Sequence, residues 1–258
     1  MKYTFSDLVD IIAKLRGKGG CPWDAEQTHA SLRRNLIEEA YEAIEAIDSG
    51  DGMTMADELG DLLMQIVFHA QIGTEDGAFT IDDVTDAVCT KMIRRHPHVF
   101  ADAVANTSAE VLSNWEEIKK EEKKLHSVAE SMASVSRYLP ALMRAEKVQG
   151  KASGVGFDWT CPEDALEKVR EETAELETAL AENTNIKEEI GDLLFAAVNT
   201  ARLCGIEPEE ALTAATDKFL HRFKKMEEYA TKNGKKLDKM HIDDMEVLWD
   251  TLKNSHKK

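Results

Sequence analysis

The sequence contains two copies of one pattern, and this repeat restricts the possible folds more than any other feature. "IEEAYEAIEAI" at residue 37 returns as "REETAELETAL" at 170, and "DELGDLLMQIV" at 57 returns as "EEIGDLLFAAV" at 188. Weaker echoes pair "DAVCTKMIRRH" at 86 with "TAATDKFLHRF" at 213, and "NWEEIKKEEKK" at 114 with "LWDTLKNSHKK" at 248. Because the order is kept, the chain is a duplication of a module of about 120 residues. We predict one module at residues 1–126 and a second at 137–258.

Both copies have helical character. The 258 residues include only five prolines, and no segment has the strict alternation of apolar and polar residues that is typical of strands. We therefore predict an all-α fold made of two tandem helical bundles. The expected helices are 4–16, 30–48, 55–72, 80–95 and 109–125 in the first module, and 137–150, 163–182, 186–204, 208–231 and 242–254 in the second.

Composition and charge exclude several functions. The formal net charge of −17 argues against binding to a nucleic acid polymer or to an anionic membrane, both of which require a basic surface. No apolar run reaches the roughly 20 residues that span a bilayer. The four cysteines lie far apart and form no metal-ligand pattern. We expect reduced thiols in a cytoplasmic protein.

The helix expected at 55–72 places carboxylates where a buried helix should have none. Its apolar residues spread around most of the circumference, and Glu58 and Asp61 occupy the narrow polar strip that remains. Helix 186–204 repeats this arrangement with Glu189 and Asp192. We predict that both helices are buried, with their carboxylates facing an interior site. The glycine inside each "GD" pair suggests close helix packing at that level.

The preceding helix of each module carries an EExxE motif whose acids share one face. Such a motif alone is more often a solvated surface, but its repetition in register favours a site. Carboxylates crowded in a partly dry site cannot all stay ionised without a cation. Oxygen ligands without Cys or His favour Mg²⁺, with Mn²⁺ as a substitute, and neither carboxylate cluster contains the Glu-x-x-His motif of a di-iron bundle. The predicted ligands are Glu39, Glu42, Glu58 and Asp61, and Glu172, Glu175, Glu189 and Asp192.

EExxE followed by ExxD on an adjacent helix, in tandem, resembles the MazG-type nucleoside triphosphate pyrophosphohydrolases. "GCPWDAEQTH", "RRHPHVF" and "GVGFDW" are also similar to segments of that family, so the likeness covers nearly the whole chain. The resemblance implies Mg²⁺-dependent cleavage of nucleoside triphosphates such as ATP between the α and β phosphates, giving a monophosphate and pyrophosphate. It also implies broad base tolerance and a house-cleaning role.

The predicted ligands of the second module suit this reaction. Metal ions held there would neutralise phosphate charge and activate a water for attack on the α-phosphorus. One carboxylate would accept the proton, and the sequence leaves Glu171 and Glu172 open for that role. The predicted catalytic residues are Glu171, Glu172, Glu175, Glu189 and Asp192.

An acidic protein needs local cations to hold a triphosphate. Lys218 and Arg222 lie four residues apart on one helical face; such pairs are commonly solvated, but by resemblance they contact the triphosphate. Lys168 and Lys253 would add to this patch. Trp249 either stacks on a base or packs between helices.

The two modules differ at one position of the ExxD helix, where the first has Phe68 and the second has Asn199. We count Asn199 among the nucleotide-binding residues and expect the second module to carry the main hydrolysis. The first is expected to be metal-competent, and either regulatory or weakly active.

Two other functions remain open from the sequence. One is a pyrimidine-specific dUTP or dCTP diphosphatase, and the other is a non-catalytic helical module that senses metal or nucleotide. A homodimer is also expected, since a module of a few short helices often completes its core with a second copy.

Overall fold

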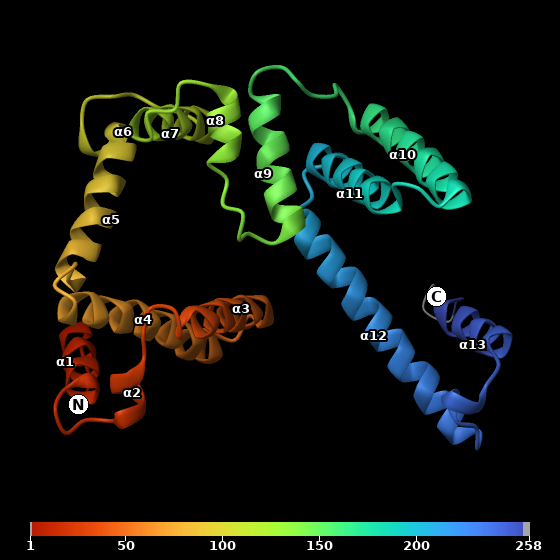
Figure 1. Cartoon of the computed structure of the whole chain (residues 1–258), viewed down its shortest axis with the longest axis horizontal. Coiled ribbons are helices and arrows are strands. Elements are labelled where there is room, and N and C mark those ends of the chain that lie inside the picture. Colours follow the sequence, from red (N-terminus) through yellow and green to blue (C-terminus); the bar gives the residue numbers. More distant parts are fainter. Residues whose placement is uncertain (1, 255–258) are drawn as a thin grey trace. The chain divides into compact units, whose positions relative to one another are not determined.

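A computed structural model describes residues 2–254, without the side chains of Lys253 and Asn254. Within this range the chain forms thirteen α-helices and one short 3₁₀ helix, and the described residues contain no strand (Figure 1). The predicted all-α fold is therefore confirmed. The chain divides into two compact units, residues 1–119 and 120–258.

Unit 1 contains a helical hairpin flanked by shorter elements. Helices α3 and α4 run side by side, and α1 and α5 pack against α4. The bounds are α1 Phe5–Arg16, α2 Pro22–Glu26, α3 Arg33–Ser49, α4 Gly52–Glu75, α5 Ile81–Arg95, α6 Pro97–Phe100 and α7 Ser108–Glu122, the last crossing the division between the units.

Unit 2 is organised around a second hairpin, formed by α10 and α11 (Figure 1). Helix α9 packs against α8, α11 and α12, and α13 packs against α12. The bounds are α8 Val128–Ala133, α9 Ala141–Ser153, α10 Pro162–Glu182, α11 Ile186–Leu203, α12 Pro208–Lys232, the 3₁₀ helix Leu237–Lys239 and α13 Ile242–Asn254.

The turns of the two hairpins correspond. Gly50 follows α3 and Asn183 follows α10, both in the left-handed conformation that reverses the chain, with φ of 70° and 54°. Asp51 then caps α4 by accepting hydrogen bonds from the backbone N–H groups of Met53 and Thr54. These turns bring the EExxE helix of each unit beside its ExxD helix.

The two units are packed differently. In unit 1, a core of large apolar side chains lies between α1, the segment before α3, and α4; it consists of Ile12, Leu32, Val67, Phe68 and Ile72. In unit 2, the buried apolar residues of the α10–α11 hairpin are smaller: Ala165, Ala179, Ala196 and Val198. Unit 2 thus leaves more space beside its hairpin.

Two expectations about the hairpins were wrong. The ExxD helices are not buried all round, because Ile66 of α4 and Ile190, Leu194 and Phe195 of α11 are exposed. Each ExxD helix carries more apolar side chains than its hairpin partner and α1 (in unit 1) or α9 (in unit 2) can cover. Nor do the mid-helix glycines mark close packing, since a Cβ added at Gly60 or Gly191 would meet no atom of the described residues.

The sequence also missed short helices. Helices α2 and α8 were not expected, and α6 forms in the stretch between the helices expected at 80–95 and 109–125. Each has six residues or fewer, too short for apolar periodicity to identify. The four cysteines are free thiols, as expected. Among the described residues, no helix is both long and apolar enough to cross a bilayer.

Candidate functional site

Three predicted ligands of unit 2 meet on the α10–α11 hairpin. Glu172 projects from α10, and Glu189 and Asp192 project from α11, with one oxygen of each within 4.8 Å of the others. The Glu172 side chain is only 7% exposed, so its charge is largely withdrawn from water. A buried carboxylate beside two others requires a cation nearby.

The charges of this cluster act on one another. Burial raises the pKa of Glu189, and the negative charges of Glu175 and Asp192 raise it further. Glu175 therefore influences the cluster, although it is not one of the three residues whose oxygens converge. The raised pKa is the electrostatic sign of a site that favours a cation.

A lysine supplies positive charge at this site. Lys168 Nζ lies 2.6 Å from a carboxylate oxygen of Glu172 and 2.9 Å from one of Glu171. Its hydrogen bonds to Glu171 and Glu172 raise the pKa of Lys168, so the ammonium stays charged. Because Lys168 is one turn before the EExxE motif, the helix itself places the cation over the acids.

The donor set fits a hard divalent cation. Oxygens around one Mg²⁺ lie about 3 to 4 Å apart, so small side-chain rotations would bring these three carboxylates into range. The converging groups are all carboxylates, which suit Mg²⁺ or Mn²⁺ better than softer metals.

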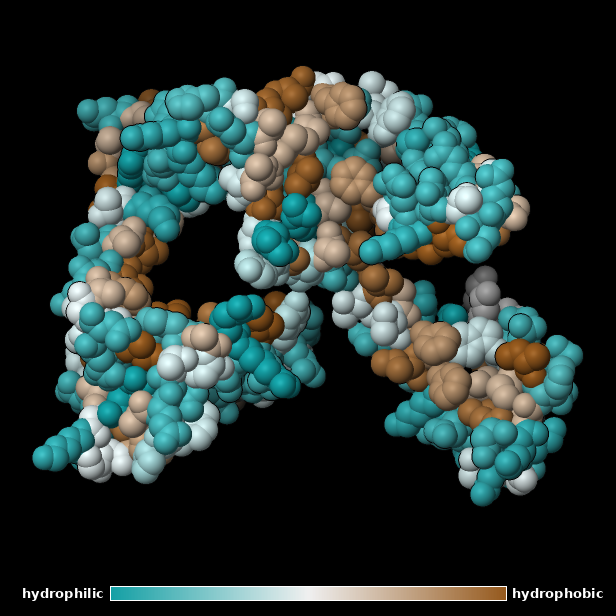
Figure 2. Space-filling model, in the orientation of Figure 1, coloured by the Kyte–Doolittle hydropathy of each residue, from teal (hydrophilic) through white to brown (hydrophobic). Residues whose placement is uncertain are grey.

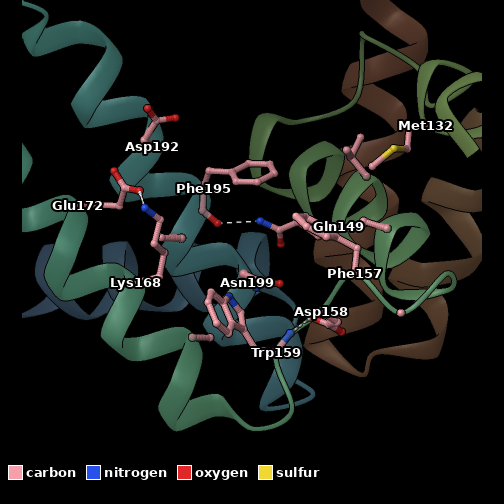
Figure 3. Close-up of a pocket in the computed structure, with 15 residues that line it drawn as sticks. Met132, Gln149, Phe157, Asp158, Trp159, Lys168, Glu172, Asp192, Phe195 and Asn199 are labelled. Atoms are coloured by element: carbon pink, nitrogen blue, oxygen red, sulfur yellow. Dashed lines mark hydrogen bonds and ion pairs between the residues drawn. The ribbon is translucent and has the colours of Figure 1, made fainter.

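A cavity of about 460 Å³ opens beside the cluster, and Figure 3 shows the residues that line it. Glu172, Asp192 and Lys168 form one side. The rest is mostly apolar, with side chains from α8, α9, α10, α11 and the loop before α10. These residues include Met132, Val148, Ala152, Phe157, Trp159, Ala165, Phe195 and Ala196.

Two amide side chains line the cavity, and only one of them was predicted from the sequence. Asn199, predicted from the sequence, is half-buried and lines the cavity. Gln149 of α9 also lines it and was not predicted. Its Nε2 donates to the backbone oxygen of Phe195 at 2.8 Å, whereas its Oε1 is buried without a partner among the described residues. An alignment of "KLRGKGG" at 14 with "KVQGKAS" at 147 pairs Arg16 with Gln149. This difference between the two repeats is the signal that could have identified the position.

Unit 1 holds a matching acidic cluster. Oxygens of Glu39, Glu58 and Asp61 converge within 4.8 Å. Burial raises the pKa of Glu39 and of Glu58, and the charges of Asp61 and Glu42 add to both shifts. Thus Glu42, like Glu175, acts on the cluster without converging on it.

In unit 1 a cation and an aromatic ring stand at the positions that correspond to Gln149 and Asn199. Phe68 stands where unit 2 has Asn199, is 5% exposed, and belongs to the apolar core. The guanidinium of Arg16 lies 5.2 Å from the Phe68 ring centre and donates to Glu75 at 2.7 Å. Arg16 also donates to the backbone oxygens of Asp24 and Gln27. Arg16 and Phe68 thus occupy, in unit 1, the sequence positions of Gln149 and Asn199, which line the cavity of unit 2.

The remaining predicted contacts lie on other helices. Lys218 and Arg222 are on α12, and Trp249 is on α13, where its ring centre is 5.1 Å from that of Phe219. Among the described residues, the lining of the cavity does not include these three. Lys253 belongs to the last turn of α13, and its side chain lies outside the described part.

Comparison with known proteins agrees with this arrangement. The profile of the MazG nucleotide pyrophosphohydrolase domain matches residues 27–100 and 161–227, once in each unit. The chain is 47% identical over 249 residues to the nucleoside triphosphate pyrophosphohydrolase/pyrophosphatase MazG of Thermotoga maritima, covering 96% of this chain and 95% of that protein. It is 42% identical over 251 residues to the nucleoside triphosphate pyrophosphohydrolase of Escherichia coli K12, covering 95% of each. It is 49% identical to Bacillus subtilis YabN, covering 99% of this chain and 53% of that protein. The chain therefore belongs to the MazG nucleotide pyrophosphohydrolase family.

Proposed function

We propose that this chain is an enzyme that hydrolyses nucleoside triphosphates to nucleoside monophosphate and pyrophosphate. The observation that carries this proposal is the convergence of Glu172, Glu189 and Asp192 beside a mostly apolar cavity. The printed names of the Thermotoga maritima and Escherichia coli relatives support the same activity. We extend it to broad base tolerance and a house-cleaning role.

The reaction needs divalent cations, and we assign Mg²⁺ to the carboxylates of unit 2, with Mn²⁺ as a substitute. Such an ion would supply charge neutralisation at the phosphates and polarise the bond that breaks. The carboxylates Glu172, Glu175, Glu189 and Asp192 would hold it. Glu171 or Glu172 accepts the proton of the attacking water. Lys168, which lies against both, would pair with a phosphate oxygen once a bound cation neutralises Glu172.

Unit 2 carries the main activity in this proposal. Its cluster opens into a cavity lined by Gln149 and Asn199, whereas unit 1 has Arg16 and Phe68, in contact with each other, at these two positions. Unit 1 would bind metal and either regulate or turn over slowly. Lys218, Arg222, Trp249 and Lys253 remain assigned to the nucleotide, as cationic and aromatic contacts from α12 and α13.

We also propose a homodimer. Leu212, Phe219 and Leu220 on α12 are each more than half exposed, and Leu194 of α11 is as well. Figure 2 shows hydrophobic side chains gathered along α12. A second copy of the chain would cover these faces and bring cations of α12 to a site. Static light scattering of the full chain should give the dimer mass, and a monomer at micromolar concentration would contradict the assembly.

A panel of purine and pyrimidine triphosphates tests the reaction. With Mg²⁺, pyrophosphate should appear as the first product from most of them, and chelation with EDTA should stop its release. Orthophosphate as the first product would overturn the site of cleavage. Turnover restricted to dUTP or dCTP would favour a pyrimidine-specific diphosphatase. Nucleotide binding without turnover over hours would favour a sensing module.

A further inference from the structure

We propose that the cavity of unit 2 is the nucleobase pocket, and that Gln149 and Asn199 read the base as one fixed hydrogen-bond acceptor and one fixed donor. This inference rests on the proposed function and deepens it. It assigns base recognition to a position on α9 and to a position on α11 that lies two turns beyond Asp192 on the same helical face.

The orientation of the Gln149 amide is determined by its neighbour. Its nitrogen faces the backbone oxygen of Phe195 at 2.8 Å, and a carbonyl can only accept a hydrogen bond. The amide oxygen must therefore point the other way. Gln149 is 7% exposed, and this oxygen has no partner among the described residues (Figure 3). A buried acceptor without a donor is unfavourable, so the site favours a ligand that brings an N–H group.

Asn199 is oriented in the opposite sense. Both Nε and Nη2 of Arg202 donate to its Oδ1, at 3.1 and 2.8 Å. A guanidinium can only donate, so the oxygen of Asn199 must face Arg202 and its NH₂ group is left to donate elsewhere. Arg202 is itself held by an ion pair with Asp158. The two amides thus offer a ligand one acceptor and one donor, each fixed by a group that cannot exchange its role.

The rest of the cavity suits a flat heterocycle. The volume of about 460 Å³ lies within the range of small-molecule pockets. Trp159 lines it and is 46% exposed, so one face of the indole is available for stacking. The carboxylates and Lys168 lie on the side where the phosphates would project (Figure 3).

This pattern predicts which bases are accepted. Each of the five standard bases carries at least one N–H and one acceptor on its pairing edge, so each can satisfy both amides. The pocket should accept standard purines and pyrimidines alike. It should discriminate against bases whose pairing-edge N–H groups are replaced by methyl groups.

The corresponding positions of unit 1 lack this pattern. Arg16 replaces Gln149, and Phe68 replaces Asn199. Arg16 offers only donors and uses them on Glu75 and on backbone oxygens, while Phe68 is buried in the core. The acidic cluster is repeated in both units, whereas unit 1 has no amide at the positions that correspond to Gln149 and Asn199.

The test compares ATP with N6,N6-dimethyl-ATP, whose pairing edge has no N–H. We expect the full-length protein to have a kcat/KM at least ~10-fold higher for ATP, since a substrate without the donor leaves Gln149 unpaired. Gln149→Met keeps the length of the side chain but removes the acceptor. In this variant the ratio should fall to about 1, mainly by loss of activity on ATP through a higher KM. Gln71→Met in α4 is the matched control and should keep the ratio of the unmodified protein.

If the ratio of kcat/KM for ATP to that for N6,N6-dimethyl-ATP stays at ~10 in Gln149→Met, the inference is overturned. The protein would then reject the dimethylated base by its size and not by its missing N–H group. UTP and N3-methyl-UTP repeat the test for a pyrimidine. If Gln149→Met does not fold, Asn199→Asp tests the donor, since it keeps an oxygen for Arg202 and removes the NH₂ group. It should lower kcat/KM for ATP by ~10-fold, and no change would contradict the assignment.

A binding experiment separates this inference from the proposed function. Ligand-detected NMR should show adenosine binding to the metal-free protein, and N6,N6-dimethyladenosine binding at least ~5-fold more weakly. Asn199→Phe, which fills the cavity as Phe68 does in unit 1, should abolish binding. If no triphosphate is hydrolysed but this pattern is seen, the hydrolytic function fails and the base pocket stands. If hydrolysis occurs but adenosine binds equally to Asn199→Phe, the base lies elsewhere.

Discussion

The two acidic clusters have nearly the same chemistry but different surroundings. In each unit two glutamates and an aspartate from neighbouring helices converge within 4.8 Å, and burial raises the pKa of at least one glutamate. Beside the unit 2 cluster lies a cavity lined by two amides. Beside the unit 1 cluster lie a buried phenylalanine and an arginine that is bound to a glutamate.

This comparison separates two requirements of such a site. Metal binding depends on acids at helical spacing, which both copies have kept. Access for a nucleoside depends on the side chains that pack beside the hairpin, and there the two units differ. Unit 1 has Arg16 and Phe68 where unit 2 has Gln149 and Asn199. A duplicated module can lose its substrate pocket through these neighbours while its acids stay intact.

The largest expected effect comes from removing a carboxylate in each unit. Asp192→Ala should lower pyrophosphate release about 10³-fold, because metal stabilisation of phosphate charge contributes several kcal/mol. Asp61→Ala, its counterpart, should lower it less than about 3-fold. Circular dichroism of both variants checks folding. Equal losses would show that both units turn over substrate, and would break the comparison.

The next effect is on stability. Phe68→Ala should reduce the free energy of unfolding of unit 1 by about 3 to 5 kcal/mol, since it creates a cavity in the apolar core. Asn199→Ala, at the equivalent position beside an existing cavity, should reduce it by only about 1 to 2 kcal/mol, through the loss of the hydrogen bonds from Arg202. Urea unfolding followed by circular dichroism measures both. Similar shifts would mean that the two positions are packed alike.

Acid should weaken unit 1 through Glu75. Hydrogen bonds from Arg16 lower the pKa of Glu75 from its ordinary 4.5. A carboxyl whose pKa is lower in the folded state contributes stability that is present above the unfolded value and is lost as pH falls through the folded one. The contribution of the Arg16–Glu75 pair should therefore decline below pH 4.5. Urea midpoints between pH 3 and 6 should fall less steeply for Glu75→Gln, and parallel curves would argue against this contact.

The smallest effect concerns Lys168, whose counterpart in unit 1 is Asn35. Lys168 neutralises Glu172 when no metal is bound, so an entering cation must displace it. Lys168→Met should tighten Mn²⁺ binding to the nucleotide-free protein by about 2- to 5-fold, in line with a partly exposed ion pair. Asn35→Lys should weaken binding at unit 1 by a similar factor. Mn²⁺ titration by electron paramagnetic resonance measures both, and unchanged affinities would show that Lys168 does not compete.

Much of this protein follows from the sequence by itself. The repeat, the all-α fold and the ten longer helices could be predicted because helix formation and the sharing of a helical face depend on residues three or four positions apart. For the same reason the sequence could place the acids of each helix on one face, and three of the four predicted ligands of each module lie together in the structure. A pattern of residues at helical spacing can be recognised without knowing which distant residues pack against it.

Only the tertiary structure decided what lies beside those acids. Arg16 meets Glu75 across 59 residues, and Gln149 meets the backbone of Phe195 across 46. Such contacts depend on how α1 and α9 pack against the hairpins, which local spacing does not encode. The sequence predicted that Asn199 would distinguish the units. The structure added Gln149 and the cavity, because the orientation of an amide is determined by the group that packs against it.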